Sequence, residues 1–196
     1  MVRLWETGGG QLLATLQGQT GVVRNVALSA DVRLLASGGG DGTVRLWATG
    51  SGHLLATFQG HTGTVWGVAL SADGQLLASG GGEGTVRLWD AGTGRALATL
   101  PGHTGAVWGD VALSADGRLV ASGGSDGTVK LWESSSGASL RTLRPALRYE
   151  RLDITGLTGI TDAQRQALIG LGAVDRSGAH PAPGLAGRRD GSQASA

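Results

Sequence analysis

Serine, histidine and a carboxylate recur in this sequence in an order that could support hydrolase chemistry, because a serine activated by a carboxylate-oriented histidine is a common nucleophile. The two complete sets are His61, Ser79 and Glu83, and His103, Ser122 and Asp126. Each set is followed by a tryptophan six residues after the carboxylate, and each serine lies in a run of small residues instead of on a strained nucleophile turn. We therefore interpret both sets as structural and predict neither catalytic residues nor enzymatic activity.

Other residue types that carry chemistry are missing or wrongly spaced. The sequence has no cysteine, which excludes disulfides, zinc–thiolate sites and a cysteine nucleophile. Its four histidines lack the spacing of metal ligands. The Gly-Gly-Gly runs at residues 38–40 and 80–82 are not followed by Lys-Ser/Thr, so they are not phosphate-binding loops. We predict no metal and no cofactor.

The composition limits the classes of partner. The 196-residue chain has a net charge of +1, and its one short basic run is Arg188-Arg189, so we expect no nucleic acid. We see neither a signal peptide nor an apolar run of membrane-spanning length, and therefore expect a soluble, cytoplasmic protein. Glycine is abundant, at 37 residues, but recurs at repeat positions and so indicates turns.

The residues that could do chemistry are positioned by a repeat. Val-Arg-Leu-Trp ends at Trp5, Trp47 and Trp89, and Val-Lys-Leu-Trp ends at Trp132, so the tryptophans are 42, 42 and 43 residues apart. Within one repeat, apolar segments at residues 64–70, 75–80, 85–90 and 95–100 alternate with turns rich in Gly, Asp and Ser. Short segments bounded by such turns are typical of antiparallel hairpins.

These repeats resemble the WD-repeat β-propeller family. The resemblance rests on Gly60-His61 with Trp89-Asp90 and on Gly102-His103 with Trp132-Glu133, and it covers Met1 to Leu143. It implies an all-β fold: an incomplete propeller of about three and a half four-stranded blades, followed by a short C-terminal helix.

The repeat count implies an unclosed ring. We place a half blade at residues 1–17, blades at about 18–59, 60–101 and 102–143, and a C-terminal segment at 144–175. Two chains would total seven blades, but both half blades are outer halves and cannot complete each other. We therefore expect the C-terminal part of a longer bacterial protein, either a truncated reading frame or a fragment, whose arc is completed by its own missing blades or by another propeller chain.

Three departures from strict repetition carry predictions. Val32 stands where other copies have glycine, so its hairpin should be looser or differently turned, because a β-branched residue tolerates positive φ badly. Asp110 is an inserted residue, for which a bulge at Gly109-Asp110 avoids turning later side chains to the wrong face. Gln19 replaces the repeat histidine.

The resemblance also implies a buried hydrogen-bonded network in each blade, joining a loop histidine, a serine, a turn carboxylate and the repeat tryptophan. Buried imidazole and indole groups need such partners. In this sequence the matching residues are His61, Ser79, Glu83 and Trp89 in one blade, and His103, Ser122, Asp126 and Trp132 in the next. The first blade has Ser37, Asp41 and Trp47, and we expect Gln19 to break its chain.

Beyond the repeats, Thr161 and Gln164 form a capping box that predicts a helix near residues 162–171. Residues 149–156 and 161–172 resemble the segment that closes large bacterial WD-repeat proteins, which often carry a nucleotide-binding switch or a kinase domain. The alternative is an ordinary amphipathic helix that covers an exposed edge. The composition of residues 176–196 predicts disorder.

Propellers of this family usually bind peptides or proteins on the rim of the channel. By this analogy Arg24, Trp66 and Trp108 lie at the rim, and tryptophan and arginine dominate interface energetics. The alternative is that both tryptophans pack against neighbouring blades. We predict a non-catalytic interaction scaffold or sensing module from a bacterial signalling protein; the alternative is a remnant without independent activity, or one that needs another chain.

Overall fold

The structure is a computed structural model that describes residues 1–144, 153, 155, 158, 161–171 and 173–175. It divides into two units, residues 1–145 and 146–196, which are treated separately below. The predicted disorder of residues 176–196 and the resemblance of residues 149–152 lie outside the described residues.

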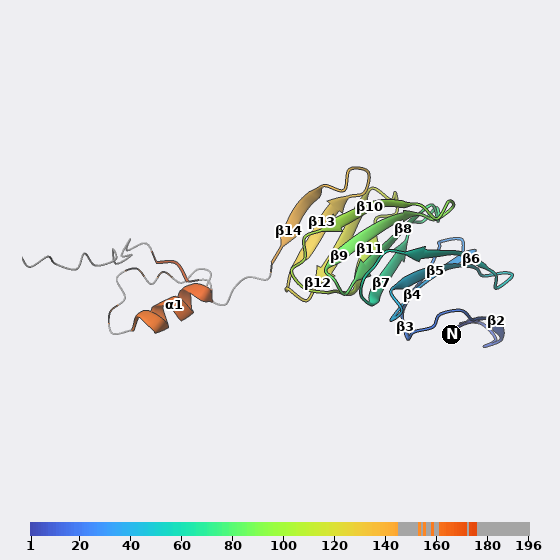
Figure 1. Ribbon diagram of the computed structural model, residues 1–196, viewed down its shortest axis with the longest axis horizontal. Coiled ribbons are helices and arrows are strands. Elements are labelled where there is room, and N and C mark those ends of the chain that lie inside the picture. The colour runs from blue at the N-terminus through green and yellow to red at the C-terminus, as the bar shows by residue number, and fades with distance from the viewer. Residues whose placement is uncertain (145–152, 154, 156–157, 159–160, 172, 176–196) are drawn as a thin grey trace, which may run out of the picture. The chain divides into compact units, whose positions relative to one another are not determined.

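The first unit consists of antiparallel sheets in which sequential strands are neighbours (Figure 1). Blade 1 contains β3 (Val23–Leu28), β4 (Leu34–Gly39), β5 (Thr43–Ala48) and β6 (Leu54–Gln59). Blade 2 contains β7 (Val65–Leu70), β8 (Leu76–Gly81), β9 (Thr85–Asp90) and β10 (Ala96–Pro101). Blade 3 contains β11 (Val107–Leu113), β12 (Leu119–Gly124), β13 (Val129–Glu133) and β14 (Ser139–Leu143).

The core lies between the blades, because one face of each sheet packs against the next. Between blades 1 and 2 the buried cluster joins Val44, Leu46 and Phe58 to Val65 and Trp89. Between blades 2 and 3 the equivalent cluster joins Val86, Leu88 and Leu100 to Val107 and Trp132. The repeat therefore generates the same apolar interface twice.

A two-stranded half blade, β1 (Val2–Trp5) and β2 (Leu12–Leu16), precedes blade 1. Leu16 packs on Leu35 and Trp47 of blade 1, and all three are buried. Trp5 has the same repeat position as Trp47 but remains 51% exposed. The half blade thus covers the outer part of one face of blade 1 and contributes outer strands only.

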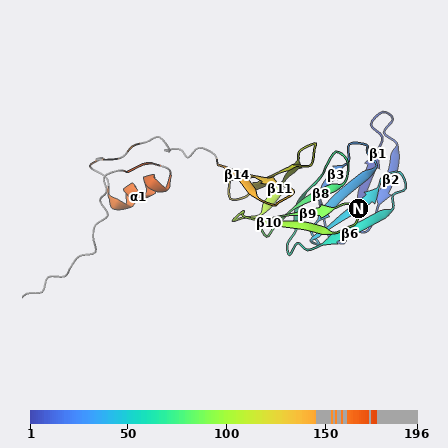
Figure 2. The same cartoon turned by 90° about the horizontal axis from the view of Figure 1, so that it is seen from above.

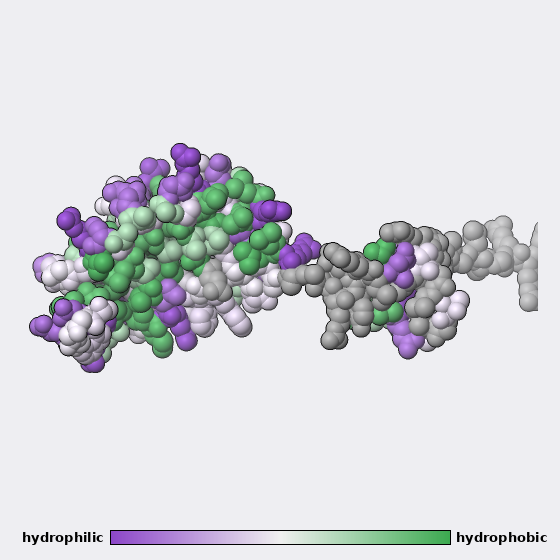
Figure 3. Space-filling view, turned by 180° about the vertical axis from the view of Figure 1, so that it is seen from behind, coloured by the Kyte–Doolittle hydropathy of each residue, from purple (hydrophilic) through white to green (hydrophobic). Residues whose placement is uncertain are grey.

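Blade 3 and the half blade lie at opposite ends of the array of sheets (Figures 1 and 2). Apolar side chains form a broad band across the sheets on the face shown in Figure 3. The open four-stranded sheets and the short helix confirm the predicted all-β class and incomplete propeller.

The hairpin at Val32 corrects one prediction. Its backbone N–H donates to the Ser29 carbonyl over 2.9 Å, as that of Gly74 does to Ser71, so the turn is neither looser nor different. Val32 instead adopts the glycine conformation itself, with φ of 58° against 69° at Gly74. Surrounding hydrogen bonds impose the turn, and the valine bears the strain.

Replacing Val32 with glycine is therefore expected to stabilise the protein by about 1 kcal/mol, because the strain is removed at some cost in chain entropy. Gly74→Val, the reciprocal change at φ of 69°, should destabilise it. Urea unfolding followed by circular dichroism measures both. Equal stability of Val32→Gly and the parent protein would show that the positive φ is not strained.

The insertion at Asp110 is absorbed within β11. The five residues from Val107 to Val111 lie opposite the three residues of β12 from Gly124 to Ser122. The corresponding span in β7 uses four residues, Val65 to Val68. Gly109 supplies a φ of 69° at the bulge, and pairing resumes with Val111 opposite Ser122, as Val68 is opposite Ser79.

In the second unit, helix α1 spans Asp162–Gly170. Thr161 accepts a hydrogen bond from the Gln164 backbone, and the Gln164 side chain accepts one from the Thr161 backbone, which forms the capping box. An ion pair joins Arg165 to Asp175 at 2.7 Å. Among the described residues, no helix has the length and apolarity needed to cross a bilayer.

Candidate functional site

Blade 2 joins its repeat tryptophan to a carboxylate through a buried chain of hydrogen bonds. The Trp89 indole donates to the Ser79 hydroxyl over 2.8 Å, and that hydroxyl lies 2.7 Å from His61 Nε2. His61 Nδ1 contacts the Glu83 carboxylate. Because a carboxylate only accepts, Nδ1 carries the proton and Nε2 accepts from Ser79.

Blade 3 repeats this arrangement. The Trp132 indole donates to Ser122 over 2.9 Å, and Ser122 lies 2.8 Å from His103 Nε2. His103 Nδ1 lies 3.2 Å from both oxygens of Asp126. Thr128 also donates to Asp126, over 2.8 Å. The structure therefore brings all four sequence-selected residues of each of these blades together.

Blade 1 corrects the expectation that Gln19 breaks the chain. The Ser37 hydroxyl donates to Gln19 Oε1 over 2.9 Å, and the Trp47 indole donates to Ser37 over 3.0 Å. Gln19 Nε2 donates to Asp41 over a long 3.5 Å and to the Thr43 carbonyl over 3.3 Å. An amide offers an acceptor and a donor on opposite sides, so glutamine occupies both roles of a neutral histidine.

One partner of the network was missed in the sequence. Arg45 Nη1 donates to Asp41 over 2.9 Å, and both side chains are largely shielded from solvent. The signal was an arginine four residues after the turn aspartate. Arg87 stands at the same position in blade 2, but its Nε is buried with no hydrogen-bond partner in the described part of the chain.

The carboxylates are held in their charged form. Burial alone would raise the pKa of Asp41, but hydrogen bonds from Arg45, Thr43 and Thr20 outweigh burial and hold that pKa well below its usual range. The pKa of Asp126 is likewise low because Thr128 and Thr104 donate to it and overcome its burial. The pKa of His61 is lowered by burial, against the opposing effect of Glu83.

The low pKa of His61 predicts a pH-dependent contribution to stability. Below the ordinary value of 6.5 the unfolded chain takes up a proton that folded His61 resists, so the free energy of unfolding falls as the pH falls. Each tenfold loss of proton affinity is worth about 1.4 kcal/mol. The stability difference between the parent protein and His61→Gln, which copies Gln19, should therefore be smaller at pH 5 than at pH 7.5.

Urea unfolding at the two pH values measures this difference. His53→Gln removes an exposed histidine outside the network and serves as the matched control. An identical pH dependence in the parent and in His61→Gln would contradict the prediction.

The networks do not present a nucleophile. Ser79 and Ser122 are buried, and each hydroxyl is already engaged by an indole and an imidazole. A substrate would have to displace both partners to reach the oxygen. Among the described residues there is also no group of three or more His, Cys, Asp or Glu side chains that could hold a metal ion.

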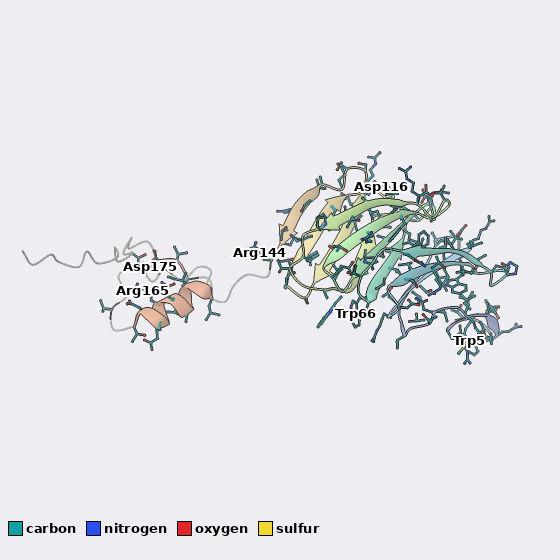
Figure 4. All side chains as sticks on the ribbon, viewed as in Figure 1. Trp5, Trp66, Asp116, Arg144, Arg165 and Asp175 are labelled. Carbon is teal, nitrogen blue, oxygen red and sulfur yellow. The ribbon has the colours of Figure 1, made fainter. Side chains whose placement is uncertain are left out.

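The predicted rim residues form a stacked strip on three consecutive first strands. The Arg24 guanidinium lies 4.6 Å from the ring centre of Trp66, and the Trp66 and Trp108 rings lie 6.4 Å apart at 51°. Trp108 is 61% exposed. Figure 4 shows Trp66 projecting from the lower edge of the sheets, well apart from Trp5. We call Arg24, Trp66 and Trp108 the rim strip.

The rim strip has features of both arrangements considered for these tryptophans, exposure at the rim and packing against neighbouring blades. Trp66 is packed between Arg24 and Trp108, whereas most of Trp108 faces solvent. The cation–π contact and the tilted ring packing hold the three side chains in one row and leave the Trp108 ring largely exposed.

The comparisons with known proteins agree with this architecture. The family described as "WD domain, G-beta repeat" matches residues 10–48, 52–90 and 94–133. A comparison with curated protein sequences found no match.

Two solved structures resemble the chain. "Structure of U3-55K" and "Crystal structure of RRP9 WD40 repeats" each show 27% sequence identity and a TM-score of 0.63. They cover 66% and 67% of this chain, respectively, and the chain spans 41% of each of theirs. Three matched repeats, the repeated blade interface and the Trp–Ser–His–carboxylate networks lead to one conclusion: the chain belongs to the WD-repeat family.

Proposed function

We propose that this chain is a non-catalytic interaction module that binds a protein or peptide through the rim strip. WD-repeat domains are typically scaffolds for protein–protein interaction. The observation that supports the proposal is the stack of Arg24, Trp66 and largely exposed Trp108 across three blades.

The chemistry of the strip suits a peptide. Tryptophan and arginine are enriched among the interface residues whose replacement with alanine weakens binding most. Their stacking also limits the rotamer freedom that binding would otherwise remove. A partner that lays an apolar or aromatic side chain on Trp108 would bury a large ring without reorganising the blades.

Peptides selected from a displayed random library against the parent protein provide the test. Trp108→Ala should lower the affinity for such peptides by at least about 30-fold, the loss typical of a dominant interface residue. Trp5→Ala removes a ring of similar exposure outside the strip and should leave affinity unchanged. Affinities are measured by titration calorimetry.

The opposite pattern would favour the packing interpretation. Peptides that bind the parent protein, Trp108→Ala and Trp5→Ala equally well would overturn the rim strip as a binding site. A lower free energy of unfolding in Trp108→Ala, without a change in affinity, would assign the ring a purely structural role.

We further propose that the blades belong to the C-terminal part of a longer bacterial signalling protein located in the cytoplasm. One support is that the sequence around α1 resembles the segment that closes large bacterial WD-repeat proteins. Another is that the chain spans only 41% of each of the two similar solved chains, so a longer protein would resemble them over more of their length. The alternative is a remnant without independent activity. In-frame repeats and a kinase or nucleotide-binding motif in the DNA upstream of Met1 would support the longer protein.

A further inference from the structure

The same contact joins successive blades at both internal interfaces. Two valines of one first strand insert against a glycine of the preceding blade: a Cβ on Gly38 would lie 2.6 Å from Val65 Cγ1 and 3.0 Å from Val68 Cγ1. A Cβ on Gly80 would lie 2.5 Å from Val107 Cγ1. Each blade therefore presents a glycine socket on one face and a valine pair on the other.

The socket of blade 3 is uncovered. Gly123 has the position of Gly38 and Gly80, and Val129 has the position of Val44 and Val86. Val129 is 43% exposed, whereas Val44 and Val86 are fully buried. An open hollow of about 340 Å³ is lined by Val111, Ala112, Ala121, Gly123 and Val129, among others. The hollow is mostly apolar and occupies the place where a following blade would insert its valines.

The valine pair of blade 1 is also uncovered. Val23 and Val26 on β3 have the positions of Val65 and Val68. Val26 is 49% exposed, whereas Val68 is only 4% exposed. On the same face Leu35 and Trp47 are buried by Leu16 of the half blade. The half blade thus leaves bare the inner part of the face, which a glycine socket would cover.

The chain carries both halves of its own repeated interface, one at each end of the arc. We propose that blade 3 of one copy docks on β3 of a second copy, with Val23 and Val26 in the socket at Gly123. The inference concerns assembly of the 196-residue chain and does not rest on peptide binding at the rim strip. In a longer protein, further blades of that protein would fill the same two places.

Docking requires blade 3 to displace the half blade of the second copy, whose Leu16 packs on Leu35 and Trp47. Residues 129–132, Val-Lys-Leu-Trp, repeat residues 2–5, Val-Arg-Leu-Trp, so β13 and β14 present the same apolar positions as β1 and β2. The outer strands of blade 3 would take the place of the second copy's half blade. The two half blades would then lie outside the contact, so the ring does not require them to complete each other.

Repeating the contact in both directions joins two copies of three blades into a ring of six. Closed propellers have four to eight blades, so this number is permitted. A head-to-tail contact forms a closed ring when its rotation returns to the start. Trp108 of each copy would then face Arg24 of the other, as Trp66 faces Arg24 within the chain.

The mass in solution is the first test. Light scattering on the purified 196-residue protein should give twice the 19.7 kDa chain mass. Val26→Asp places a carboxylate in the contact and should yield monomer. Leu97→Asp is the matched control, since Leu97 is 51% exposed although its blade has neighbours on both faces, and this variant should remain dimeric.

Cross-linking identifies the contact itself. The chain has no cysteine, so Val23→Cys combined with Gly123→Cys creates a single pair. At the equivalent internal position a Cβ on Gly38 lies 3.3 Å from Val65 Cβ, close to disulfide geometry. Oxidation should give a disulfide-linked dimer in this variant, whereas Leu97→Cys with Gly123→Cys should not.

Three results would overturn the proposal. They are a monomer at every concentration, a dimer that Val26→Asp and Leu97→Asp affect equally, and a dimer that the Val23–Gly123 pair does not cross-link. A ladder of larger species cross-linked through that pair would overturn ring closure. Selected peptides that bind both the parent and monomeric Val26→Asp would show that assembly and rim binding are separate properties.

Discussion

Trp89→Ala is expected to lower the free energy of unfolding by about 3–5 kcal/mol, the cost of deleting a large buried aromatic side chain. Trp89 is 2% exposed, packs against the Phe58 ring at 5.5 Å and lies 6.3 Å from the His61 ring. Truncation would leave a cavity between blades 1 and 2 and remove the donor to Ser79. Urea unfolding followed by circular dichroism measures the loss.

Trp5→Ala is the matched control for this prediction. Trp5 occupies the same repeat position on the half blade but is 51% exposed, so its truncation should change the free energy of unfolding by no more than about 0.5 kcal/mol. Equal effects of Trp89→Ala and Trp5→Ala would show that the repeat tryptophan does not derive its contribution from burial between blades.

Ser79→Ala should cost about 2–4 kcal/mol although it removes a single oxygen atom. That hydroxyl serves the Trp89 indole at 2.8 Å and His61 Nε2 at 2.7 Å, and its loss leaves two buried polar groups without their partner. Each such group costs about 1–3 kcal/mol. The free energy of unfolding from urea titration again provides the measurement.

Ser51→Ala removes an exposed hydroxyl from a turn and should be nearly neutral. If Ser79→Ala were equally neutral, the chain of hydrogen bonds from Trp89 to Glu83 would contribute nothing to stability. If instead the loss exceeded the cost of Trp89→Ala, the network would outweigh the packing of the ring.

The sequence was sufficient for the elements and their order, because every strand is bounded by turn residues that recur with the tryptophans. The insertion at Asp110 was also readable, since a uniform register before and after it leaves a bulge as the simplest solution. The repeat period predicts the structure correctly where neighbouring blades fold in the same way.

The predictions from sequence were wrong where the tertiary environment overrides the conformational or hydrogen-bonding preference of a single residue. Val32 accepts a positive φ because the hairpin hydrogen bonds to Ser29 form regardless of the side chain. Gln19 completes the network because its amide reproduces a donor and an acceptor, which a search for histidine overlooks. The stacking of Arg24 on Trp66 depends on the rotation between blades, which no single repeat encodes.

The bulge at Gly109 also bears on how such a chain can change its length. Since the additional residue is confined to the three positions between Val107 and Val111, the hairpins that follow keep their register. The bulge lies against Gly67 of β7, where a Cβ would lie 2.8 Å from the Gly109 carbonyl oxygen, so single-residue insertions at the corresponding places in other first strands need a glycine opposite them in the neighbouring blade. A first strand can therefore diversify by growth in length as well as by substitution, provided that the residue facing the insertion is glycine.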